Sequence, residues 1–110
     1  MAKLESRIHE VQGKRLTFEI PDKETIIVGR ATEGDSFMPD LAIQGNSHIS
    51  RKHCAMYRQG NSYQIEDLAS TNGTFLNDSR LVIGEKRVVP NRAEVRLGNE
   101  RNGESYLFIY

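Results

Sequence analysis

The stretch CAMYRQGNSYQIEDLASTNGTFLND, residues 54–78, decides much of the fold of this 110-residue chain. Its first part holds two strand-like runs, 54–59 and 62–67, separated by Gly60-Asn61. Gly and Asn tolerate the positive φ angles of tight turns, so these runs are predicted to form a β-hairpin. The Asn72-Gly73 pair is the same kind of signal and predicts a second hairpin tip.

Strand-like patterns continue on both sides of this stretch. In RLTFEI, residues 15–20, every second residue is apolar and Pro21 ends the run. TIIVG, residues 25–29, is apolar on both faces and is predicted to be an interior strand. The other expected strands lie around residue 8 and at 41–43, 54–59, 62–67, 74–76, 81–83, 87–89, 93–97 and 106–110. About eleven short strands without a helical stripe predict an all-β sandwich or barrel.

The composition limits the class of protein. The content of 37% hydrophobic and 27% charged residues is that of an ordinary folded domain. No apolar run approaches the roughly 20 residues that span a membrane, and the first residues lack the apolar core of a signal peptide. A cytoplasmic location without a membrane partner is therefore expected. Fifteen basic residues balance fifteen acidic ones, which argues against a nucleic-acid partner held by net charge.

Sites for nucleotides, catalysis or metals fit the residues poorly. GRATEGDS, residues 29–36, has the glycine spacing of a P-loop, but Asp35 stands where that motif needs a lysine. Ser50, His53 and a carboxylate could be drawn as a hydrolase triad, yet no strained nucleophile turn or oxyanion loop accompanies them. His48 and His53 lack a third metal ligand at a persuasive spacing, and the chain has only one cysteine. No enzymatic activity, cofactor or metal is expected.

Three short motifs share one chemical logic. Gly29-Arg30 ends a predicted strand, SRKH (50–53) precedes the next long one, and STNG (70–73) forms the predicted turn. Arginine offers a planar fork of donors that suits phosphate, and hydroxyl groups add short donors. Asparagine both donates and accepts, which suits a peptide backbone. These groups converge if the loops leave the same end of a sandwich, beside the long irregular stretch 31–48.

The same motifs, in this order, resemble the forkhead-associated (FHA) domain. The marks of that family are Gly-Arg, then Ser-x-x-His, then Asn-Gly preceded by a hydroxyl residue. The downstream run VIGEKRVVPNRAEVRLGN, residues 82–99, also is similar to the family. The resemblance covers about residues 16–110 and implies a single domain over 1–110. It further implies a two-sheet antiparallel β-sandwich of the SMAD/FHA-like type, which binds phosphothreonine peptides through loops at one end.

The resemblance assigns a role to each motif residue. The residues that it implies for phosphate binding are Arg30, Ser50, Arg51 and Thr71. The residues that it implies for contact with the peptide are Asn72, beside the phosphothreonine, and His48, beyond it. The residues that it implies for structural support are Gly29, His53 and Gly73. Asn77 is expected to be a turn residue rather than a ligand contact.

The partner that the resemblance implies is a phosphothreonine-containing protein or peptide made by a Ser/Thr kinase. The chain is expected to act as a monomer or as one domain of a larger protein. Two alternatives stay open: an FHA-like scaffold that binds partners or itself without phosphate, and a small hydrolase. The sequence leaves open the identity of the partner and its residues beyond the phosphothreonine.

Overall fold

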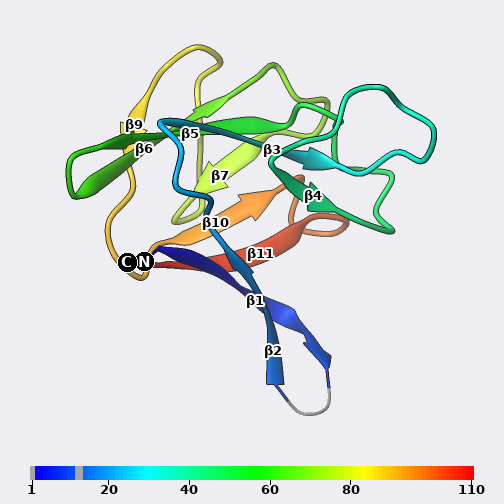
Figure 1. Ribbon diagram of the computed structural model, residues 1–110, viewed down its shortest axis with the longest axis horizontal. Coiled ribbons are helices and arrows are strands. Elements are labelled where there is room, and N and C mark those ends of the chain that lie inside the picture. The colour runs from blue at the N-terminus through cyan, green and yellow to red at the C-terminus, as the bar shows by residue number, and fades with distance from the viewer. Residues whose placement is uncertain (1, 12–13) are drawn as a thin grey trace.

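The computed structural model describes residues 2–11 and 14–110, which form two facing β-sheets (Figure 1). Within these residues there is no helix, and hence none that could cross a membrane. The strands are β1 (Lys3–Val11), β2 (Lys14–Glu19), β3 (Thr25–Arg30), β4 (Leu41–Ile43), β5 (Cys54–Gln59), β6 (Ser62–Asp67), β7 (Thr74–Leu76), β8 (Ser79–Arg80), β9 (Arg87–Val88), β10 (Glu94–Leu97) and β11 (Glu104–Ile109).

One sheet has the order β2-β1-β11-β10-β7-β8, and the other has the order β4-β3-β5-β6-β9. All neighbouring strands are antiparallel except β3 and β4, which are parallel. The predicted all-β sandwich is therefore confirmed.

The core lies between the sheets, because alternate side chains of each strand point inward. In β6, Tyr63 and Ile65 are buried, and in β11 Tyr106 and Phe108 are buried. The rings of Tyr63 and Phe108 meet edge to face across the sandwich, with centroids 5.2 Å apart. Such burial stabilises the fold by about 1.5–3 kcal/mol for each large apolar side chain.

The predicted hairpin at Gly60-Asn61 is confirmed, since β5 and β6 pair directly on either side of it. The predicted hairpin at Asn72-Gly73 is wrong: β6 and β7 belong to different sheets, so this segment crosses between them. The true hairpin joins β7 to β8 through Asn77-Asp78, where φ is 48° and 66°. Positive φ at both central residues is the requirement of a type I′ turn, and the turn role expected of Asn77 is confirmed.

The strand predicted at 81–83 is also wrong. The chain instead pairs at β8 and then turns at Gly84, where φ is 83°. Leu81 is buried, whereas Val82 and Ile83 are each 63% exposed. The apolar run contributes a single side chain to the core and its β-branched residues stay outside.

The strand register gathers several loops at one end of the second sheet. Val28 of β3 lies opposite Cys54 at the start of β5, and Cys54 lies opposite Asp67 at the end of β6. The parallel β4 ends beside Arg30. Consequently the 31–40, 44–53 and 68–73 loops all meet this end (Figure 1).

Candidate functional site

The loops at this end enclose an open depression of about 460 Å³. Its lining residues are Arg30, Ser47, His48, Ile49, Ser50, Arg51, Thr71 and Asn72. The structure thus brings together all six residues that the sequence nominated for phosphate or peptide contact. They come from three segments that are distant in the chain.

Gly29 allows the 50–53 segment to lie directly on β3. A Cβ atom at Gly29 would overlap the carbonyl oxygen of Arg51, so no larger residue fits without moving the backbone. Two hydrogen bonds clamp this close approach. The Arg30 amide donates to the carbonyl of Ser50 at 2.9 Å, and the His53 amide donates to the carbonyl of Val28 at 2.9 Å. This packing fixes the position of Arg30 relative to Ser50.

His53 joins the 44–53 loop to the 68–73 loop from inside the fold. Its Nδ1 accepts from the Ser50 amide at 3.1 Å, and its Nε2 donates to the Gly73 carbonyl at 2.7 Å. An amide can only donate and a carbonyl can only accept, so the ring is neutral with its proton on Nε2. Burial lowers the pKa of His53, against the opposing effects of the Gly73 bond and the Asp67 charge.

A buried carboxylate shapes the 68–73 loop. Asp67 accepts from the Ser70 hydroxyl at 2.6 Å, the Thr74 hydroxyl at 2.7 Å and the Ser70 amide at 3.2 Å. The Ser70 hydroxyl in turn accepts from the Gly73 amide at 3.0 Å. The sequence interpretation missed this role of Asp67, although Asp followed by Ser three residues later is a pattern that favours such local bonds.

Polar contacts across the rim leave several groups open to a ligand. The Thr71 amide donates to the Ser50 hydroxyl at 3.1 Å, so the Ser50 hydrogen can still be donated outward. Asn72 Nδ2 donates to the His48 carbonyl at 2.7 Å, which leaves its amide oxygen and second N–H available. The rim is therefore held in place before any ligand arrives.

Arg30 brings an unsatisfied donor to the depression. Its Nε is buried and has no hydrogen-bond partner among the described residues. The residue also forms no ion pair with any side chain that the structure describes. A buried donor without a partner costs about 1–3 kcal/mol, more for a charged group. The positive charge of Arg30 is therefore left without a partner among the described residues, beside a depression that the residue lines.

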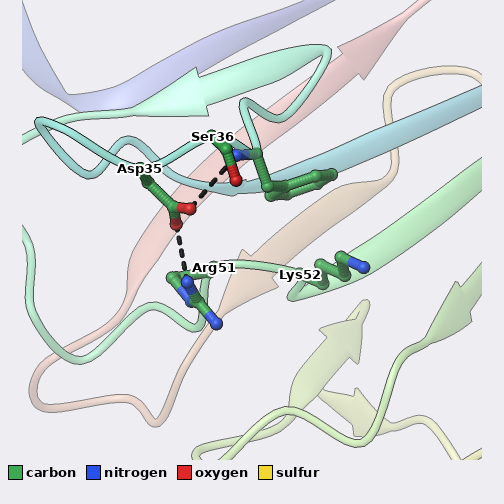
Figure 2. Close-up of a pocket in the computed structure, with 5 residues that line it drawn as sticks. Asp35, Ser36, Arg51 and Lys52 are labelled. Atoms are coloured by element: carbon green, nitrogen blue, oxygen red, sulfur yellow. Dashed lines mark hydrogen bonds and ion pairs between the residues drawn. The ribbon is translucent and has the colours of Figure 1, made fainter.

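Arg51 lies differently from Arg30. Its guanidinium Nη1 is 2.6 Å from Oδ2 of Asp35, which belongs to the 31–40 loop (Figure 2). Asp35 also accepts from the Phe37 amide at 3.1 Å, and this bond, followed by the Arg51 contact, lowers the pKa of Asp35. The sequence interpretation used Asp35 only to reject a nucleotide site and did not anticipate this ion pair.

A model of the FHA domain family matches residues 26–98. The chain belongs to the FHA family. This FHA domain is 31% identical over 80 residues to the oxoglutarate dehydrogenase inhibitor of Corynebacterium jeikeium, across 73% of this chain and 49% of that protein. The chain spans about half the length of the curated relatives it matches.

Solved structures share the fold of this FHA domain. Full-length yeast Pml1p superimposes with a TM-score of 0.83 at 20% identity, over 99% of this chain and 81% of that one. The N-terminal FHA domain of Saccharomyces cerevisiae Rad53p, solved with a phosphothreonine peptide, gives a TM-score of 0.72 at 18% identity, over 98% and 91%. The resemblance predicted from the motifs is confirmed at the level of family and fold.

Proposed function

We propose that this FHA domain is a non-catalytic module that binds phosphothreonine-containing peptides or proteins at the depression described above. The observation that carries the proposal is that Arg30, Ser50 and Thr71 line one depression, where the Arg30 guanidinium has no ion pair among the described residues. Membership of the FHA family supports it, as does the phosphothreonine peptide held by the Rad53p domain.

Each residue then has a distinct task. Arg30 binds phosphate oxygens with its guanidinium, and Ser50 donates its hydroxyl. The Thr71 amide is already bonded to Ser50, so Thr71 contributes its own hydroxyl. Arg51 follows Ser50 at the rim and contacts the phosphate through its backbone or side chain, although its guanidinium also pairs with Asp35. Asn72 holds the peptide backbone beside the phosphothreonine.

The energies fit a selective but reversible interaction. A phosphothreonine carries about −1.5 to −2 charges and three strong acceptor oxygens. Each hydrogen bond to such a group is worth about 1.5–3 kcal/mol, so three or four separate a phosphorylated from a plain peptide by several kcal/mol. The surface is small and the ligand loses flexibility on binding, so the affinity is expected to be roughly micromolar.

The deciding experiment compares matched peptides. Calorimetry or fluorescence polarisation would measure the affinity of the chain for an oriented peptide library containing phosphothreonine, phosphoserine or plain threonine at the fixed position. We expect binding of the phosphothreonine series alone to reach micromolar affinity. Equal binding of phosphorylated and plain peptides would favour the phosphate-independent scaffold instead.

The partner is proposed to be the product of a Ser/Thr kinase in the cytoplasm. The absence of catalysis is proposed with it, because Ser50 and His53 have structural partners that a hydrolase triad would not share. The His53 Nδ1 accepts from the Ser50 backbone amide, not from its hydroxyl. Turnover of generic ester or phosphate substrates by the purified chain would contradict this part of the proposal.

A further inference from the structure

A second depression shares Arg51 with the candidate phosphate site. It has a volume of about 440 Å³ and is lined by Asp35, Ser36, Phe37, Arg51 and Lys52 (Figure 2). Arg51 lines both depressions, whereas Thr71 and Asn72 line only the first. A peptide held at Asn72 would therefore reach the second depression with residues on the opposite side of its phosphothreonine.

The negative charge in the second depression is already neutralised. The Asp35 carboxylate is 2.6 Å from Arg51 and accepts from the Phe37 amide. Both contacts favour its charged form, and the pKa of Asp35 is lowered. The charges of Asp35 and Arg51 thus cancel, and the positive charge of Lys52 remains.

Lys52 is the uncompensated charge of this depression. Its side chain is exposed, and within the described part of the chain no carboxylate lies at ion-pair distance from it. The Nζ atom lies 4.7 Å from the centroid of the Phe37 ring. An aromatic face attracts an ammonium group and restrains it, but it does not cancel its charge.

We propose that this depression is an acidic-residue subsite, in which Lys52 binds a Glu or Asp side chain of the phosphopeptide. The carboxylate would lie beside the Lys52 ammonium, in the depression that Ser36 also lines. The proposal rests on the proposed function, because it extends the same ligand past Arg51. It makes Lys52 a specificity-determining residue for a position flanking the phosphothreonine, distinct from the side that faces Asn72.

The test is a double-mutant cycle between Lys52 and the peptide. Phosphothreonine peptides would carry Glu or its neutral isostere Gln at each flanking position in turn, and affinities would be measured for the original chain and for Lys52→Gln. We expect one position where Glu binds roughly two- to fivefold more tightly than Gln, the range of an exposed ion pair. That gain should disappear in Lys52→Gln and remain in Lys52→Arg.

The matched control is Lys86→Gln. Lys86 also lies over an aromatic ring, with Nζ 4.2 Å from the centroid of Tyr57, but it lines neither depression. It should leave the Glu preference unchanged, and thermal melting of all variants would check that each is folded.

A Glu preference that persists in Lys52→Gln, or no Glu preference at any position, would overturn the subsite while leaving phosphothreonine binding in place. Failure of the original chain to prefer phosphothreonine over threonine would remove the proposed function itself, and the subsite with it.

Discussion

The Nε2 of His53 donates a hydrogen bond to the carbonyl oxygen of Gly73, 2.7 Å away and inside the fold. The same carbonyl accepts from the Gly98 amide at 2.8 Å, so one oxygen ties the 68–73 loop to the start of β5 and to the end of β10. The other ring nitrogen of His53 accepts from Ser50. The residues proposed to bind the phosphate are therefore positioned by a neutral imidazole, which is itself buried and does not contact the peptide.

This arrangement predicts that acid destabilises the domain. The folded pKa of His53 is lowered below the ordinary value of 6.5, so the unfolded chain binds its proton more readily. The contribution of His53 to the free energy of unfolding is therefore complete above about pH 6.5. It is lost as the pH falls from there through the lowered pKa of the folded state. Protonation would point an N–H at the Ser50 amide. Urea unfolding at a series of pH values should show the decrease.

An NMR titration of the imidazole resonances provides the check specific to His53. Its midpoint should lie below 6.5, and the slope of stability with pH should flatten in His53→Asn. A His53 midpoint at or above 6.5 would contradict the role of His53 as a neutral, buried imidazole that joins the two loops.

Gly29→Ala should damage the site through the backbone. The new Cβ would collide with the Arg51 carbonyl, and relief of that overlap costs about 1–3 kcal/mol of stability. The displaced 50–53 segment would move Ser50 away from Thr71, so affinity for a phosphothreonine peptide should fall as well. Gly60→Ala is the control: φ is 60° there and no atom lies near the added Cβ. It should lose some stability but keep its affinity.

Asp67→Asn should loosen the 68–73 loop. The buried carboxylate accepts three hydrogen bonds from Ser70 and Thr74, and an amide nitrogen in its place cannot accept. The unfolding free energy should fall by about 1–3 kcal/mol, the cost of leaving buried polar groups unpaired. Asp22→Asn is the matched control, since Asp22 pairs with Arg58 but is 74% exposed. Denaturant unfolding should give a clearly lower free energy of unfolding for Asp67→Asn than for Asp22→Asn. Equal values would exclude this role for Asp67.

The fold was largely predictable because its strands are marked by local patterns. Alternation at 62–67 and the Gly60-Asn61 turn specify a hairpin with little outside help. The errors have a shared cause. Asn72-Gly73 has the local chemistry of a hairpin tip, but the choice between pairing with β6 and crossing to the other sheet depends on where β7 finds partners. The strand predicted at 81–83 is wrong for the same reason, since apolar residues alone do not determine whether a neighbouring strand is available for pairing.

For the candidate site too, the features marked by local sequence were predictable, and the contacts between distant loops were not. Its residue types and order indicated a phosphate-binding surface, and the structure brings those residues to one depression. Contacts between distant loops could not be foreseen, such as the ion pair of Arg51 with Asp35. These contacts depend on backbone paths that only the assembled sandwich provides.

Arg30 yields the sharpest prediction for the proposed site. Arg30→Ala should reduce the affinity for a phosphothreonine peptide by at least about tenfold, because it removes a charge-assisted bond worth about 1.5–3 kcal/mol. Arg30→Lys should restore only part of this, since a single ammonium cannot reproduce the planar fork. The fold should remain intact, as the guanidinium has no ion pair among the described residues and its buried Nε no partner. Removing an unsatisfied donor relieves a cost rather than breaking a contact.

Arg87→Ala, which removes a guanidinium bonded to Ser79 outside either depression, controls for net charge. Calorimetric titrations and melts of the three variants would settle the matter, and unchanged affinity in Arg30→Ala would exclude this arginine from the binding site.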